Sequence, residues 1–143
     1  MGRRARRRRT VPLVPPKRRD PAEVAAAVRS VLAALDAGAA PARPDLALAV
    51  RGLANQLAEV APGHHVEARI PPYAAVQCVE GPRHTRGTPP NVVELDPVAF
   101  VELCTGRVRW AEVTADGRVR TWGDRADLSP WLPLPPGDDL GSV

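Results

Sequence analysis

The spacing of apolar residues changes at Pro62-Gly63 of this 143-residue chain. Upstream, apolar residues recur every three or four positions, as in Leu46, Val50, Leu53, Leu57 and Val60. Downstream, Val66, Ala68 and Ile70 alternate with charged residues. The first spacing predicts a helix with one buried face, and strict alternation predicts a strand with one buried face. The chain must therefore pack helices against a sheet.

Caps and turn residues place the remaining elements. Asp20-Pro21 and Asp96-Pro97 each predict a helix start, and Gly38 and Gly106 predict the corresponding ends. The first predicted helix ends at Gly38, and a linker follows over 39–44. Further helices are predicted over 46–60, 97–105 and 107–114, with a last one, broken by proline, over 124–132. Strands are predicted over 66–70, 73–79, 91–95 and 118–122. This order, with a hairpin at Pro71-Pro72, indicates an α+β domain. We expect an antiparallel sheet of four or five strands with helices packed on one face.

Positive charge is concentrated at the N-terminus. Residues 1–19 carry nine positive charges and no acid, whereas residues 20–143 carry eleven arginines against sixteen acids, a net charge of −5. We predict a disordered Arg-rich tail over 1–19, a folded domain over 20–134 and a flexible tail over 135–143. The N-terminal tail contains no aromatic residue, so its contacts with nucleic acid or an anionic membrane should be non-specific. The alternative is a solvated tail without a binding role.

Several functional classes find little support. Cys78 and Cys104 have no CxxC spacing and fit small buried hydrophobes of a reducing compartment. Adjacent His64 and His65 would face opposite sides of a strand, so we expect no metal site. Cys78 with His84 is the only candidate catalytic pair and lacks an activating third group, so we expect no catalytic residue, no cofactor and no enzyme activity. No apolar run approaches the roughly 20 residues of a bilayer span. We expect a cytoplasmic protein.

Basic side chains gather in the Pro- and Gly-rich loop between the strands over 73–79 and 91–95. Arg83, His84 and Arg86 are candidates to hold an anionic head group, because guanidinium groups donate paired hydrogen bonds to carboxylates and phosphates. The alternative is a structural loop whose arginines pair with Glu80, Glu94 or Asp96.

Four of the five aromatic residues fall between Phe100 and Trp131. This clustering predicts an apolar ligand pocket between sheet and helices, lined by Val76, Cys78, Phe100, Val101, Cys104, Trp110 and Trp122. The alternative is that these side chains fill the interior themselves.

The order of motifs from Asn91 to Leu134 resembles the sterol carrier protein type 2 family. The shared series is a strand, an Asp-capped helix, a Leu103-Cys-Thr105-Gly106 stop, a short helix at Trp110, a strand ending near Gly123-Asp124, and a C-terminal helical segment. With Pro-Pro-Tyr73 and the loop over 81–91, the chain is more closely similar to the actinobacterial branch called bacterial sterol-carrier orthologues. The resemblance extends over residues 20–134.

This resemblance implies a sheet layered with helices around an apolar tunnel for a lipid or acyl group. We therefore expect a non-catalytic carrier domain for an apolar or acyl-bearing metabolite. The alternatives are a protein-interaction or scaffold module with a filled core, or association with RNA or membrane through residues 1–19.

Overall fold

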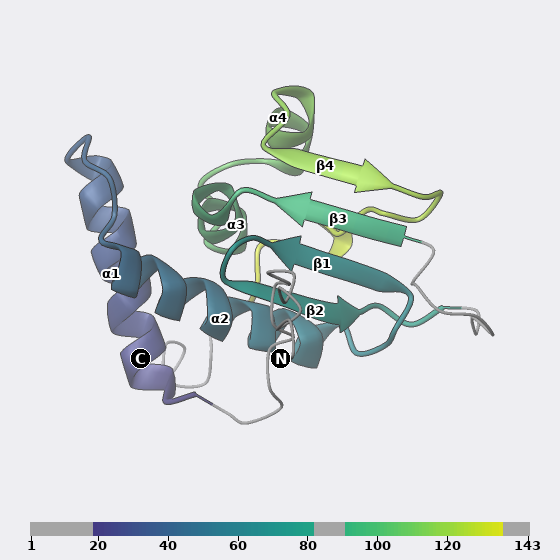
Figure 1. The fold of residues 1–143 in the computed structure, drawn as a ribbon, viewed down its shortest axis with the longest axis horizontal. Coiled ribbons are helices and arrows are strands. Elements are labelled where there is room, and N and C mark those ends of the chain that lie inside the picture. Colours follow the sequence, from purple (N-terminus) through teal and green to yellow (C-terminus); the bar gives the residue numbers. More distant parts are fainter. Residues whose placement is uncertain (1–18, 82–90, 136–143) are drawn as a thin grey trace, which may run out of the picture.

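The computed structural model describes residues 19–81 and 91–135 (Figure 1). Three sequence-based predictions lie largely or wholly outside these residues: the disordered tail over 1–19, the flexible tail over 135–143, and the anion-binding role of Arg83, His84 and Arg86. Among the helices of the described parts, none combines the length and apolar character that a bilayer crossing requires.

Two long helices form the N-terminal layer. Helix α1 (Pro21–Asp36) starts where the Asp20 carboxylate accepts a 2.9 Å hydrogen bond from the backbone N–H of Ala22. Helix α2 (Arg43–Val60) begins one turn before its apolar pattern, with Pro44 in its first turn. The two helices pack closely, because a Cβ at Gly52 would lie only 2.5 Å from both γ-methyl carbons of Val24.

Within the described residues, four strands form one sheet in the order β2-β1-β3-β4. They are β1 (Val66–Ile70), β2 (Ala74–Cys78), β3 (Asn91–Leu95) and β4 (Val119–Trp122). The predicted hairpin is confirmed, since β1 and β2 pair antiparallel, as do β3 and β4.

The prediction of a purely antiparallel sheet is wrong, because β1 and β3 pair parallel. Strand β2 ends beside the start of β1, with Cys78 opposite Val66, and β3 starts there too, with Asn91 opposite Val66. The chain thus crosses from one edge of β1 to the other without changing ends of the sheet. Strand β3 consequently runs opposite to β2 and in the same direction as β1, which makes the sheet mixed.

Strand alternation gives the sheet one buried face. In register across the strands, the buried residues are Cys78, Val76 and Ala74 on β2, Val66, Ala68 and Ile70 on β1, Asn91, Val93 and Leu95 on β3, and Val119 on β4. The intervening positions face the other way, and most of them, including Glu67, Arg69 and Glu94, are partly exposed, whereas Ala75 is buried. The core therefore lies on one side of the sheet, as expected for helices on one face.

Helices and the C-terminal segment cover that face. Helix α3 (Pro97–Cys104) follows β3, and helix α4 (Trp110–Ala115) leads into β4 (Figure 1). The predicted final helix is reduced to the 3-10 turn η1 (Ser129–Trp131), since prolines at 130 and 133 cannot donate helical hydrogen bonds. Beyond it, Leu134 is buried and donates its backbone N–H to the Cys104 carbonyl at 3.0 Å.

Candidate ligand-binding site

Five of the seven predicted pocket residues come together beneath the sheet. Val76 and Cys78 project from the buried face of β2, and Phe100, Val101 and Cys104 project from α3. All five belong to one continuous hydrophobic cluster, and none is more than 5 % exposed. Side chains of α2 and the C-terminal segment, including Leu57 and Leu128, complete this cluster. The result is an apolar layer between the sheet and the helices.

The two tryptophans of the predicted pocket lie elsewhere. Trp110 is partly buried and packs against the edge of the core. Trp122 is 50 % exposed, so the expectation that it faces the interior is wrong. Its position in β4 is opposite Val92, on the face of the sheet that carries Glu94, whereas Val119 is opposite Leu95 and lies on the core side. The clustering of aromatic residues predicted that Trp122 lies in the interior, but the alternation of side chains along β4 places it on the opposite face of the sheet.

Both cysteine thiols lie in this apolar layer. Burial raises the pKa of Cys78 to about 12 and that of Cys104 further still. At neutral pH both sulfurs therefore remain protonated and behave as small apolar groups. Among residues 19–81 and 91–135, nothing in their setting provides the thiolate that a cysteine nucleophile needs.

A buried polar pair marks one end of the apolar layer. His65 and Asn91 are 8 % and 3 % exposed and are the two polar residues that are buried among the described residues. The amide nitrogen of Asn91 lies 3.1 Å from Nε2 of His65 and donates to the His65 carbonyl at 3.2 Å. The amide oxygen of Asn91 accepts the backbone N–H of Arg125 at 2.9 Å. Asn91, the first residue of β3, thus joins the residue before β1 to the segment after β4.

Sequence reasoning considered His65 only as a metal ligand and missed this pair. Its neighbour His64 is exposed and has Nδ1 2.5 Å from Oε1 of Gln77. The two histidines point to different surroundings, but both lie in the bend just before β1, so the premise that they are strand residues is wrong. No group of three or more potential metal ligands lies together within residues 19–81 and 91–135.

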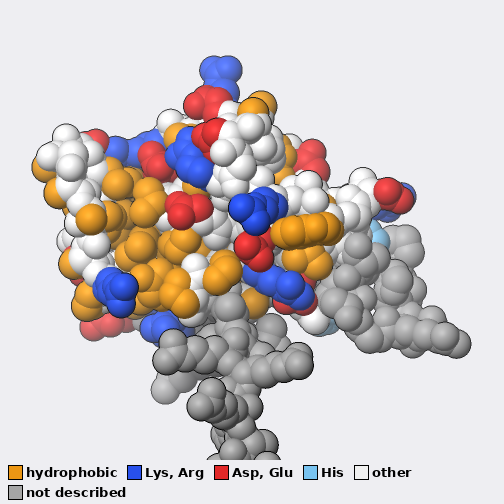
Figure 2. All heavy atoms as spheres, turned by 45° about the horizontal axis from the view of Figure 1, so that its top comes forward, with side chains coloured by type: hydrophobic (Ala, Val, Ile, Leu, Met, Phe, Trp, Pro, Cys, Tyr) orange, Lys and Arg blue, Asp and Glu red, His pale blue; other side chains and the backbone are white. Residues whose placement is uncertain are grey.

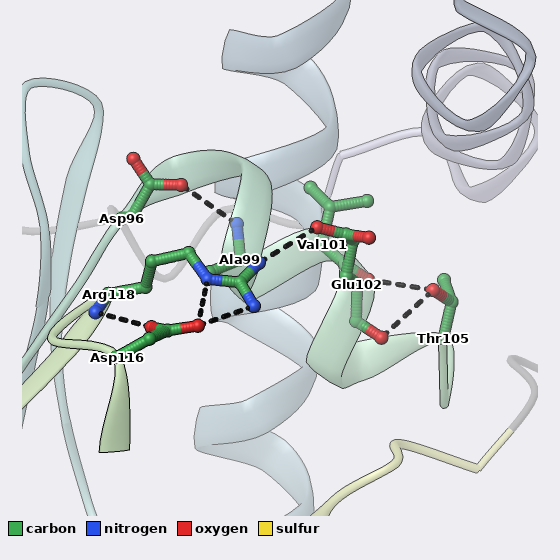
Figure 3. A network of polar contacts seen from close by, with 7 residues as sticks. All are labelled: Asp96, Ala99, Val101, Glu102, Thr105, Asp116 and Arg118. Atoms are coloured by element: carbon green, nitrogen blue, oxygen red, sulfur yellow. Dashed lines mark hydrogen bonds and ion pairs between the residues drawn. The ribbon is translucent and has the colours of Figure 1, made fainter. Parts of the chain in front are cut away.

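A hollow of about 410 Å³ lies at the opposite end of the sheet. It is lined by Pro71, Glu94, Leu95, Asp96, Pro97, Asp116, Gly117, Arg118 and Arg120. Figure 3 shows how several of its charges are already engaged: Arg118 contacts Asp116 at 2.8 Å and Glu102 at 3.5 Å. Hydrogen bonds from Arg118 hold the pKa of Asp116 below its usual value. This charged surface suits water or a polar group better than a hydrocarbon chain.

Comparison with known proteins agrees with this architecture. The family model described as bacterial SCP ortholog matches residues 42–134, from the start of α2 to Leu134. Helix α1 lies outside the matched range, although it packs against α2. A comparison with curated proteins finds no match. The matched range is well over half of the chain, and the protein belongs to the bacterial family of sterol carrier protein (SCP) orthologues.

Proposed function

We propose that this protein is a non-catalytic carrier that binds an apolar or acyl-bearing metabolite in the layer between the sheet and the helices. The observation that carries this proposal is the continuous buried cluster formed by one face of β1, β2 and β3 with α2 and α3. Family membership supports it, because sterol carrier proteins are carrier domains. The protonated, buried thiols of Cys78 and Cys104 support a binding role without covalent chemistry.

An alkyl chain would gain free energy from burial in this layer. Each methylene removed from water contributes about 0.8 kcal/mol, which is roughly fourfold in affinity. Association itself costs several kcal/mol, so short chains should bind weakly and each added methylene should strengthen binding. The side chains that now occupy the layer must move to admit such a chain. Leu128 and Leu134 are candidates for this movement, because they belong to the C-terminal segment rather than to the sheet or a long helix.

A series of fatty acids tests the proposal. The purified protein is titrated with a fluorescent fatty acid, which is then displaced by saturated fatty acids of 8 to 14 carbons below their micellar concentrations. We expect the affinity to rise two- to fourfold per methylene. Native mass spectrometry of the freshly purified protein should also show a bound apolar molecule. Absence of binding across the whole series would overturn the carrier proposal.

A protein-interaction module is the second candidate, and exposed apolar surface favours it. Trp122 is half exposed on the face of the sheet away from the core. Figure 2 also shows hydrophobic side chains gathered on the side where Figure 1 places α1 and α2. A protein that binds no fatty acid but loses a co-purifying protein on Trp122→Ala substitution would favour this alternative over the carrier.

A further inference from the structure

One buried nitrogen has no partner among the described residues. Nδ1 of His65 makes no hydrogen bond in residues 19–81 and 91–135. Two other buried side-chain nitrogens, on Arg19 and Asn55, share this property, but their residues are only partly buried. His65 is more than nine-tenths buried. An unsatisfied polar group at such a position costs free energy and calls for an explanation.

The contacts of Asn91 determine which nitrogen of His65 carries the proton. The Asn91 oxygen accepts the backbone N–H of Arg125, so the Asn91 amide group must face His65 with its N–H donors. One of those donors points at Nε2 of His65, which must therefore be the acceptor. A neutral imidazole with Nε2 as acceptor carries its proton on Nδ1. The unpartnered atom is thus a hydrogen-bond donor.

The ring that carries this donor lies at one end of the apolar layer. Sheet register aligns Cys78, Val66 and Asn91 in one row across β2, β1 and β3, all on the buried face. Asn91 holds the His65 ring at the end of that row, whereas α3 begins at the far end of β3. A straight alkyl chain that starts near His65 would therefore run under the sheet along Val93 and Leu95 toward α3.

Gly81 keeps the chain close to this ring. A Cβ at Gly81 would lie 2.3 Å from Cγ and 2.6 Å from Nδ1 of His65. Any side chain at position 81 would therefore displace the imidazole or cover Nδ1. The glycine allows the ring to remain buried against the backbone of residue 81, while Nδ1 has no hydrogen-bond acceptor in the described chain.

We infer that the Nδ1–H of His65 donates a hydrogen bond to an oxygen at the polar end of the carried molecule, a carboxylate or an acyl carbonyl. This inference rests on the proposed carrier function and assigns the head-group end of its site. The ligand class is an acyl chain with an acceptor oxygen at its head. His65 would orient the ligand, and the apolar layer would supply most of the binding free energy.

Ligands with a common twelve-carbon chain test the inference. Dodecanoate and methyl dodecanoate present acceptor oxygens, charged and neutral, while dodecyltrimethylammonium presents none. In His65→Gln, the side-chain amide group lies near the former Nε2 position and leaves no donor at the Nδ1 position. In His65→Asn, the shorter side chain places its amide group near the former Nδ1 position and so keeps a donor there. We expect His65→Gln to weaken dodecanoate binding on the order of tenfold and dodecyltrimethylammonium binding less than about twofold. We expect His65→Asn to retain most of the affinity for dodecanoate.

Two further measurements make the test independent of folding losses. His64→Phe is the matched control, since His64 is exposed and adjacent, and it should leave all three affinities unchanged. In the wild-type protein, long-range ¹H–¹⁵N correlation spectra should show protonated Nδ1, and the Hδ1 resonance should move downfield with dodecanoate but not with dodecyltrimethylammonium. If the protein binds these chains but His65→Gln changes no affinity and Hδ1 does not move, the head-group assignment is wrong and the carrier function stands. If no chain binds to the wild type, the carrier function fails, and the head-group assignment fails with it.

Discussion

Arg107 and Asp36 join the loop after α3 to the C-terminal end of α1. The two nitrogens Nη1 and Nη2 of Arg107 lie 2.6 Å and 3.2 Å from Oδ1 and Oδ2 of Asp36, a paired geometry typical of strong ion pairs. This contact ties the matched family region to the one described helix that lies outside it. Both side chains are exposed to solvent, 35 % for Arg107 and 64 % for Asp36.

Neutralising this pair should have a small and pH-dependent effect. The hydrogen bond from Arg107 holds the pKa of Asp36 below its usual value. A lowered folded-state pKa means that the pair stabilises the fold at neutral pH and that this contribution is lost as the pH falls below about 4. We expect Asp36→Asn to lower the melting temperature by no more than about 3 °C at pH 7. The difference should vanish at pH 2.5, and it should shrink in 1 M salt. A larger loss at pH 2.5 than at pH 7 would contradict this assignment.

Substitution of Gly52 tests the close packing of α1 on α2. An alanine at position 52 gains about 1 kcal/mol in helix propensity, but its Cβ overlaps both γ-methyl groups of Val24. Valine is stiff at χ1, so the helices must separate, and we expect a net loss of about 1–2 kcal/mol in urea unfolding. Val24→Ala removes the obstructing methyl groups. The double variant Gly52→Ala/Val24→Ala should therefore be more stable than Gly52→Ala alone, and simple additivity of the two losses would contradict the predicted contact.

The Asp96 carboxylate caps helix α3, accepting the backbone N–H of Ala99 at 3.0 Å (Figure 3). Because α3 carries three predicted pocket residues, a frayed start should also disturb the apolar layer. We expect Asp96→Ala to lower the free energy of unfolding by about 1 kcal/mol. Asp96→Ser is the control, since a serine hydroxyl accepts the same bond, and it should recover most of the loss. Equal stabilities of the Ala and Ser variants would show that the cap contributes nothing.

The buried thiols should resist chemical modification in the folded protein. With a pKa raised from 9.0 to about 12, the thiolate fraction of Cys78 at pH 8 falls on the order of a thousandfold. We expect an aromatic disulfide reagent to label Cys78 and Cys104 only as fast as the protein unfolds, and both within seconds in denaturant. Rapid labelling of either thiol under native conditions would show that the layer admits the reagent.

Local signals gave the elements that the structure contains. Asp-Pro pairs start α1 and α3 as predicted, because an N-cap and a first-turn proline act within a few residues. The linker predicted over 39–44 extends two residues too far, because α2 begins at Arg43 and a helix tolerates a proline in its first turn. The parallel pairing of β1 with β3 could not be predicted from local patterns, since it depends on the path of the chain between distant strands.

In the candidate site, too, local patterns predicted some features, whereas contacts between distant residues could not be predicted. Apolar residues such as Val76 and Phe100 were predicted to be interior from their pattern, and both are buried. The buried, hydrogen-bonded state of His65 was missed, because it depends on Asn91, which lies 26 positions away in the sequence. A useful signal was the isolated asparagine at the start of an apolar strand, where a buried amide requires partners.

The crossing from β2 to β3 has more chain than it needs. Both ends lie at the same end of the sheet with only β1 between them, a span of about 10 Å, whereas the twelve residues over 79–90 reach up to about 40 Å when extended. Strand register is fixed elsewhere, by the pairing of β1 with both neighbours. Val79 and Gly81 are tied to the His65 end of the layer, Val79 by backbone hydrogen bonds to His65 and Ala61 and Gly81 by its close approach to the imidazole. Changes in length or sequence beyond Gly81 are compatible with an unchanged sheet, which makes that part of the connection the natural place to graft new recognition chemistry beside the His65 end of the layer.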